Sequence, residues 1–235
     1  MVINLIVKKL KIISIIPARC NSKRIKNKNI IKFNNKPLMA HTILHSIKSK
    51  YISRTIVSTD SKKYAKIAKS YGAEILFLRP KNISKDNSTD LECFNHCLSF
   101  LKKNENYIPD IIVHLRSTYP IRKIFLIDSC IKRLLKNKKF NLLKTICKSE
   151  IPIEKMWFMN KDKSIHNPVT KNNLNHSLPD QSLLQSYCQN GCVDVMRVKY
   201  FSSKPKDKNR ILGFVMKDNF DINTLNDVKK NFKII

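Results

Sequence analysis

A basic segment between residues 17 and 29 carries the side chains best suited to chemistry. It is rich in cations and polar groups, holds no acid, and includes Arg19, Ser22, Lys23, Lys28 and Asn29. Arginine grips phosphate oxygens with two parallel hydrogen bonds, and lysine acts as a point charge. Asparagine also tolerates the left-handed backbone that glycine usually adopts. We therefore expect this segment to be a binding loop for a polyanion such as a triphosphate.

The elements that must position this loop follow a regular alternation. The apolar run 12–16 is stopped by Pro17, which is typical of a buried parallel strand. Further strands are predicted at 55–58, 75–78, 110–115, 142–147, 192–196 and 211–216, and helices at 38–47, 61–71, 89–103, 124–135 and 224–232. This alternation predicts a three-layer α/β/α fold with a mainly parallel sheet. Ligands bind beyond the carboxyl ends of such strands, which is where the basic loop lies.

Residues 148–189 break the alternation. Polar residues and scattered prolines surround Trp157 and Phe158 there, without helical or strand periodicity. A segment of this length without clear elements is unusual inside a compact domain. We expect an inserted dimerisation arm that packs on a second copy, so that the protein is a homodimer. Residues 1–10 are predicted to be an extension ahead of a single domain that spans 11–235.

Composition limits the classes of function. The chain has 235 residues and 3 glycines, which excludes the glycine-rich phosphate loops. A net charge of +29 produces a strong positive field and keeps a nucleic-acid-binding protein as an alternative. The lysines are spread over many segments, and the chain lacks helix-turn-helix, zinc-finger and RNA-recognition signatures. We therefore favour a solvated basic surface and expect no specific nucleic-acid partner.

The cysteines favour packing over metal binding. There are 7, none in a CxxC pair. Cys93, His96 and Cys97 are spaced to share a helical face, but no second ligand pair has zinc spacing. Reduced thiols suit a cytoplasmic location. No segment approaches 18 consecutive apolar residues, so we expect no membrane span.

A series of short motifs runs through residues 12–232. They are Pro17-Ala18-Arg19, Ser22-Lys23-Arg24-Ile25, Lys28-Asn29, Lys36-Pro37-Leu38, Val57-Ser58-Thr59-Asp60, Tyr71-Gly72-Ala73-Glu74, Leu78-Arg79-Pro80, Asp86-x-x-Thr89, Leu115-x-x-Thr118-x-Pro120-Ile121-Arg122, Asn190-Gly191 and Asp221-Ile222-x-Thr224. In this order they resemble the CMP-sialic acid synthetases, the acylneuraminate cytidylyltransferases. Each motif is modest alone, and together they are highly specific.

The resemblance implies that an anomeric hydroxyl of an acidic nine-carbon sugar attacks the α-phosphate of CTP, giving a CMP-sugar and pyrophosphate. It also implies four groups of site residues. Arg19, Lys23 and Asp221 would be catalytic. Nucleotide binding would fall to Arg19, Ser22, Lys23, Lys28, Asn29, Arg79 and Thr89. Arg116, Thr118, Arg122 and Asn190 would bind the sugar, and Asp221 and Asn223 would hold Mg²⁺ or another divalent cation.

The chain departs from the family pattern mainly where the sugar and metal would bind. Arg116 stands where glutamine is usual, Ser117 replaces a proline, Cys188 replaces a common arginine, and Asn223 replaces an aspartate. Arg116 suits an anionic acceptor, either a carboxylate or a sugar phosphate. A related nucleotidyltransferase acting on a different sugar or sugar phosphate is therefore one open alternative. A catalytically weakened relative is another, because Asn223 offers magnesium only a neutral oxygen.

Overall fold

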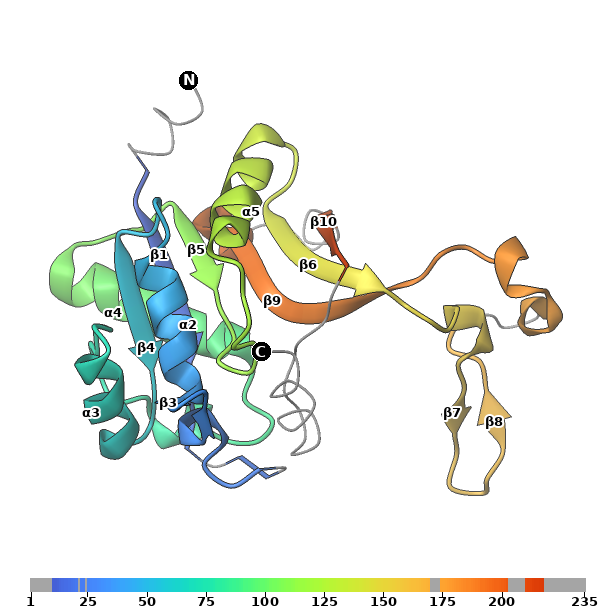
Figure 1. The fold of residues 1–235 in the computed structure, drawn as a ribbon, viewed down its shortest axis with the longest axis horizontal. Helices are drawn as coiled ribbons and strands as arrows, with labels where there is room; N and C mark the ends of the chain where they lie inside the picture. The colour runs from blue at the N-terminus through green and yellow to red at the C-terminus, as the bar shows by residue number, and fades with distance from the viewer. Residues whose placement is uncertain (1–9, 21, 24, 170–173, 203–209, 218–235) are drawn as a thin grey trace.

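The computed structural model describes residues 10–20, 22–23, 25–169, 174–202 and 210–217 (Figure 1). The predicted helix at 224–232 and the predicted metal residues Asp221 and Asn223 lie outside this part of the chain. So does nearly all of the predicted N-terminal extension. The remaining residues carry the sheet, the helices around it and most of the arm.

One six-stranded sheet runs through the molecule, with the order β10-β6-β9-β5-β1-β4. Its strands are β1 (Ile12–Pro17), β4 (Arg54–Ser58), β5 (Ile111–His114), β6 (Leu142–Lys148), β9 (Tyr187–Arg197) and β10 (Ile211–Met216). β1 runs parallel to β4 and β5, and β10 runs parallel to β6. β9 is antiparallel to both of its neighbours, β5 and β6. The predicted mainly parallel sheet is confirmed.

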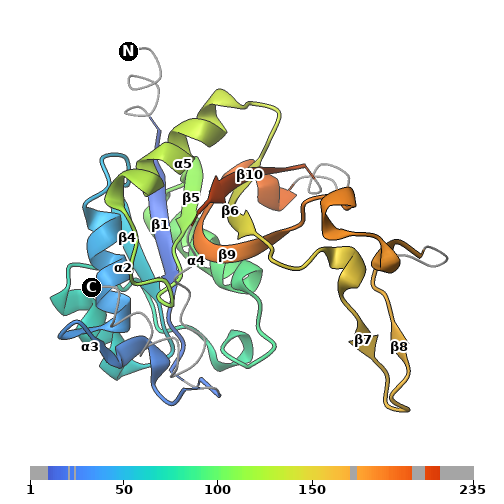
Figure 2. The same cartoon turned by 45° about the vertical axis from the view of Figure 1, so that its right-hand side comes forward.

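Helices cover both faces of this sheet (Figure 2). The helices are α2 (Leu38–Ile47), α3 (Lys62–Ser70), α4 (Asp90–Glu105) and α5 (Ile124–Lys136). Met39 of α2, Tyr64 of α3 and Ile131 of α5 belong to one buried cluster on the sheet. Cys93 and Phe94 of α4 belong to a second cluster on the opposite face. These two apolar layers confirm the three-layer α/β/α fold, and they show that Cys93 is a core residue.

The strand predicted at 75–78 is wrong as a regular element. This segment makes only two isolated bridges with the β4 edge, Ile56 with Glu74 and Thr59 with Leu78. Between them Leu76 and Phe77 pack against the α4 cluster, while Ile75 packs on the other side of the sheet. Because the consecutive residues Leu76 and Phe77 pack on the same side of the sheet, the alternation of a regular strand is broken, although the segment still follows β4 to Arg79.

A tight hairpin follows the basic loop. Lys28–Ile30 forms a 3₁₀ turn, and β2 (Lys32–Phe33) then pairs with β3 (Lys36–Pro37). The two turn residues, Asn34 and Asn35, have φ angles of 44° and 61°. Such left-handed pairs match the twist of hairpin strands. Asn27 in the basic loop is also left-handed, with φ 56°, which confirms the predicted use of asparagine there.

The arm leaves the sheet between β6 and β9 (Figure 1). It contains 3₁₀ turns at Ile153–Lys155, Leu174–Ser177 and Asp180–Ser182, and a small antiparallel hairpin of β7 (Phe158–Met159) and β8 (Ile165–His166). Its predicted limits overlap the sheet, because Lys148 pairs with Tyr187 and β9 continues from there. Trp157 is 43% exposed. A last 3₁₀ turn, Val198–Ser202, follows β9. Within the described residues, no helix has the length and apolar character needed to cross a membrane.

Candidate active site

A cleft of about 260 Å³ lies at the carboxyl ends of β1 and β5. Four segments build it: the loop after β1, the segment beside β4 that ends at Arg79, the start of α4 and the loop after β5. The predicted site residues that line it are Arg19, Ser22, Lys28, Asn29, Arg79, Thr89, Arg116 and Thr118. Residues that lie almost 100 positions apart in the sequence therefore meet around one cavity.

The basic loop is anchored at both ends. The backbone N–H of Cys20 donates to Asp60 Oδ1 at 2.9 Å, and the Cys20 thiol lies 3.3 Å from Asp60 Oδ2. Burial, followed by the bond to Asp60, raises the pKa of Cys20, so the thiol is poorly ionised. At the other end Asn29 Nδ2 donates to the Arg19 carbonyl at 2.9 Å, and Asn29 Oδ1 accepts from the Ser117 hydroxyl. Asn29 thereby ties this loop to the loop after β5.

Two cations of the loop share one carboxylate. Arg19 Nη1 lies 2.6 Å from Asp86 Oδ1, and Lys23 Nζ lies 2.7 Å from Asp86 Oδ2. The hydrogen bonds from Lys23 and then Arg19 lower the pKa of Asp86. Lys23 itself is exposed and stands outside the residues that line the cleft. Asp86 thus holds the two predicted catalytic cations side by side.

Arg79 presents unpaired donors to the cleft. Its backbone N–H bonds to the Thr59 carbonyl at 2.8 Å, which fixes the residue beside β4. The residue is only 7% exposed, and its Nε and Nη2 atoms have no hydrogen-bond partner among the described residues. Burying a charged group without partners is costly. Two guanidinium donors in this position favour a ligand that supplies acceptor atoms, either anionic oxygens or the acceptors on a base edge.

Thr89 begins α4 at the edge of the cleft. Its hydroxyl accepts from the Glu92 N–H at 3.2 Å, and Glu92 Oε2 accepts from the Thr89 N–H at 2.6 Å. This reciprocal pair is a capping box, which satisfies the first donors of the helix. The positive end of the α4 dipole therefore lies at the cleft.

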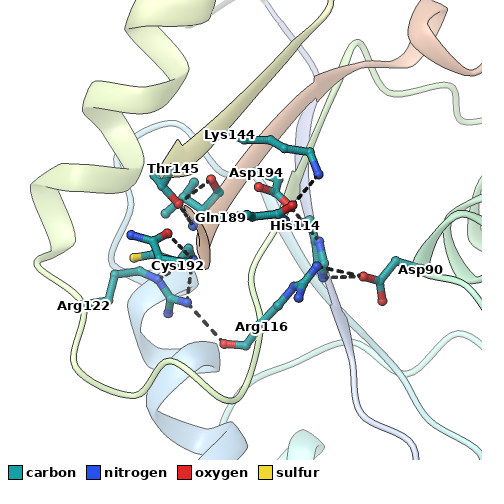
Figure 3. A network of polar contacts seen from close by, with 11 residues as sticks. Asp90, His114, Arg116, Arg122, Lys144, Thr145, Gln189, Cys192 and Asp194 are labelled. Atoms are coloured by element: carbon teal, nitrogen blue, oxygen red, sulfur yellow. Dashed lines mark hydrogen bonds and ion pairs between the residues drawn. The ribbon is translucent and has the colours of Figure 1, made fainter. Parts of the chain in front are cut away.

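Arg116 lies where the cleft meets β9 (Figure 3). Its Nη2 atom is 3.3 Å from Asp90 Oδ2, and its Nε atom has no partner among the described residues. The side chain passes against Gly191, where an added Cβ would come 3.0 Å from Arg116 Cδ. Gly191 also has φ +67°, so both its backbone and its lack of a side chain suit this passage.

Two residues predicted to bind the sugar do not line the cleft. Arg122 is 4% exposed and donates through Nη2 to the carbonyls of Cys192 and Arg116, at 2.8 and 3.2 Å. Asn190 is buried, with Oδ1 accepting from the Cys192 N–H and Nδ2 directed to Met216 Sδ. The polar groups of both residues therefore bond within the protein, Arg122 across to the β9 backbone and Asn190 within β9 and toward β10. Arg122 positions the backbone of Arg116.

Several residues at the site were missed in the sequence reasoning. Asp86 was visible as part of a motif, but its role as a shared anion was not predicted. Asp90 and His114 line the cleft, and their side chains are 3.9 Å apart at Oδ2 and Nε2. The signal for His114 was available, because a polar residue ended an otherwise apolar strand at the ligand-binding edge.

The fold and the cleft define an α/β protein of the nucleotidyltransferase type. A family model described as Cytidylyltransferase matches residues 13–197. The match covers most of the chain, and the chain belongs to this cytidylyltransferase family.

Individual relatives agree with this assignment. The chain is 29% identical over 191 residues to the N-acylneuraminate cytidylyltransferase of Escherichia coli O18:K1:H7, with 81% of this chain and 43% of that protein covered. It is 26% identical over 228 residues to the CMP-N,N'-diacetyllegionaminic acid synthase of Campylobacter jejuni, covering 96% and 93%. The chain therefore spans less than half of the first relative and nearly all of the second.

Solved structures share the fold. A CMP:2-keto-3-deoxy-manno-octonic acid synthetase complexed with CTP superposes with a TM-score of 0.69 at 12% identity. The comparison covers 95% of this chain and 98% of that one. At this identity the likeness establishes the fold alone.

Proposed function

We propose that the protein transfers CMP from CTP to an acidic nine-carbon sugar and releases pyrophosphate. The anomeric hydroxyl oxygen forms a bond to the α-phosphorus as the bond to the bridging oxygen of the β-phosphate breaks. The hydroxyl proton is released, and pyrophosphate carries away the electron pair. The names of the relatives support this reaction, and the buried Arg79 donors are the structural observation that carries it.

The cleft supplies positioning and charge, which is most of what phosphoryl transfer needs. Arg19 and Lys23 bind the triphosphate, which replaces Asp86 as their anionic partner. The guanidinium of Arg79 donates to the acceptor atoms of cytosine, beside Thr89 at the start of α4. Arg116 faces the acceptor from the other end of the cleft.

Single-turnover assays with CTP, Mg²⁺ and a panel of acidic sugars test this proposal. We expect CMP-sugar and pyrophosphate in equal amounts from at least one nonulosonic acid. Arg79→Gln should weaken CTP binding about tenfold or more, because a charge-assisted hydrogen bond is lost. CMP transfer to a sugar 1-phosphate but to no acid would replace the proposed acceptor. Absence of transfer from CTP to any of them would contradict the function.

Magnesium is the expected cofactor, held by Asp221 and Asn223. Among the described residues, Asp90 is the carboxylate that lines the cleft, and Arg116 already engages it. The family resemblance assigns the metal oxygens to Asp221 and Asn223, and we propose that these two residues supply them. A bound Mg²⁺ would neutralise charge on the phosphate oxygens.

The asparagine at 223 makes the metal proposal testable. Asn223→Asp should lower the Mg²⁺ concentration for half-maximal rate several-fold, because a second carboxylate adds a full charge around a hard cation. Asp221→Asn should abolish Mg²⁺-dependent turnover. The measurement is a Mg²⁺ titration of the transfer rate at saturating CTP. An unchanged titration in both variants would place the metal elsewhere.

We also propose a homodimer formed through the arm, and a cytoplasmic setting. Large apolar side chains are exposed along the arm, including Phe158, Met159 and Leu184. Such a surface is typical of an interface. All 7 cysteines are free, which supports a reducing compartment.

A further inference from the structure

A second chamber of about 220 Å³ opens beside the nucleotide cleft. The two cavities share Asp90, His114 and Arg116, so a ligand can extend from one into the other. Much of the second chamber is apolar, with walls from Phe94, Leu142, Met196 and Ile211. Its other polar side chains are Lys144, Asp194 and Tyr200.

Asp194 occupies the middle of a row across three strands. It pairs in register with His114 on β5 and with Lys144 on β6, so the carboxylate lies between an imidazole and an ammonium group (Figure 3). His114 Nδ1 is 3.4 Å from Asp194 Oδ2. Lys144 Nζ donates to Gln189 Oε1 at 2.9 Å and remains beside the row. His114, Asp194 and Lys144 therefore form a row of neighbouring polar side chains that lines the second chamber.

One oxygen of this carboxylate is left unpaired. Asp194 is 5% exposed, and its Oδ1 atom has no hydrogen-bond partner among the described residues. Burial raises the pKa of Asp194, but the bond and charge of His114, followed by the charges of Lys144 and Arg116, outweigh burial and hold the pKa below its usual value. The group is thus ionised, and a buried ionised oxygen without a donor is costly.

We propose that Asp194 selects the acceptor, by accepting a hydrogen bond at Oδ1 from an N–H or O–H group of the acidic sugar. Arg116 pairs with the acid group of the same sugar, and the apolar wall receives its methyl or methylene groups. His114 is the positioning residue, because it orients the other carboxylate oxygen. This inference rests on the proposed function and names the chemistry of its acceptor site.

A purely structural role for Asp194 predicts a loss of stability without any change in acid binding. The pairing with His114 already stabilises the ionised carboxylate in the folded protein, and removing one partner of a buried pair is destabilising, so acid binding is the readout that separates the two roles. Asp128 provides a matched control. It is also a buried carboxylate, but both of its oxygens are bonded, to the Ser49 hydroxyl at 2.6 Å and to the Lys50 N–H at 3.3 Å.

The experiment measures binding without turnover. N-acetylneuraminic acid, N,N'-diacetyllegionaminic acid and a nonulosonic acid with a hydroxyl in place of the acylamino group are titrated onto the CTP-bound enzyme in EDTA. Asp194→Asn should weaken binding of the preferred acid by about ten- to a hundredfold and leave the Kd of CTP unchanged. It should also unfold at a lower urea concentration than the parent, because the pairing with His114 is lost. Asp128→Asn should lose stability and keep the Kd of the acid.

The role of His114 is tested with two substitutions, one that keeps a hydrogen-bond donor and one that removes it. His114→Asn keeps a donor near the Nδ1 position, whereas His114→Leu removes it. We expect the asparagine variant to retain acid binding within a few-fold and the leucine variant to lose it as Asp194→Asn does. The hydroxyl-bearing acid separates the two donor types, since weaker binding of that acid identifies an N–H donor.

Each outcome decides between the two proposals. Unchanged acid binding in Asp194→Asn overturns the inference and leaves CMP transfer standing. Acid binding that depends on Asp194, without CMP transfer when Mg²⁺ is restored, upholds the chamber and overturns the proposed function. If none of the acids binds the parent, both are wrong.

Discussion

Single side chains in this cleft act mostly through their neighbours. Asn29 was predicted to bind nucleotide, yet its amide joins the Arg19 carbonyl to the Ser117 hydroxyl, 88 residues away in the sequence. Its residue type could be recognised from sequence, because an amide both donates and accepts. Its partners could not, since they depend on how two loops meet after folding.

Arg19 carries the first prediction at this scale. Arg19→Ala should lower the rate of CMP transfer about a hundredfold or more, because it removes a preorganised charge aimed at the triphosphate. The rate is measured at saturating CTP and acceptor. Lys26→Ala is the control, since Lys26 is exposed in the same loop and does not line the cleft. Equal losses in both variants would mean that the loop contributes only general positive charge.

The elements are held in place by a few positions with unusual backbone. Gly72 follows α3 with φ +89°, as expected for the glycine that ends a helix. Gly191 adopts φ +67° within β9, beside Arg116. An L side chain at either position is strained, but only the second position touches the site.

This contrast gives a prediction for two glycines. Gly72→Ala and Gly191→Ala should each lower the free energy of unfolding by about 1–2 kcal/mol, the cost of left-handed backbone. Gly191→Ala should in addition weaken acceptor binding, because the new Cβ lies 3.0 Å from Arg116 Cδ. Gly72→Ala meets only the end of Ile47 and should leave binding unchanged. Urea unfolding and acid titration measure the two effects, and matching acid affinities would disconnect Gly191 from Arg116.

Helix α2 carries a histidine that stays neutral. Burial, followed by the charge of Arg122, lowers the pKa of His45 to about 3. Between pH 6.5 and 3 the unfolded chain takes up a proton at His45 that the folded protein does not. The free energy of unfolding therefore decreases as the pH is lowered through this range.

His45→Gln should therefore flatten the acid limb of the stability curve. Between pH 7 and 4.5 the parent should lose on the order of 2 kcal/mol more than the variant. Urea unfolding at the two pH values gives the comparison, with the pH 7 difference subtracted. A parallel loss in both proteins would show that His45 is protonated in the folded state as well.

Helices and strands could be predicted where the pattern of apolar residues along the segment matched the way its side chains are buried. Strand 12–16 is apolar apart from Ser14, and its side chains alternate between the two helical layers, so its pattern was unambiguous. Segment 75–78 looked similar, but Leu76 and Phe77 pack on the same side of the sheet, so the alternation is lost and the ladder fails. The antiparallel direction of β9 was not predictable, because direction is set by the path of the chain through the arm. The edge of the sheet where the cleft opens could be predicted from sequence, whereas the chamber around Asp194 required the pairing of β5, β6 and β9.

At the scale of the whole molecule, the arm is the feature that supports the proposed dimer. Phe158 and Leu184 are 59% and 84% exposed, and both belong to the arm, which extends away from the sheet and its helices (Figure 1). Burial of such side chains contributes roughly 1.5–3 kcal/mol each. Within a single copy of the protein these side chains remain exposed, so only packing against a partner would provide this free energy.

The oligomeric state tests the arm directly. The 27.4 kDa chain should sediment as a dimer, and Phe158→Glu with Leu184→Glu should shift it to monomer at micromolar concentration. Phe125→Glu is the control, because Phe125 is 64% exposed on α5, outside the arm. A parent that sediments as a monomer, or arm variants that stay dimeric, would contradict the proposed interface.

The place where the arm leaves the sheet has an evolutionary consequence. β6 and β9 are antiparallel neighbours, so everything between Lys148 and Tyr187 is topologically the connection of one hairpin. Lengthening such a connection costs little, since closure entropy grows only with the logarithm of its length. The sheet register on either side is fixed by the strands themselves. Evolution can therefore lengthen, shorten or reshape the arm, and with it the proposed dimer interface, without changing the strand ends beside the cleft.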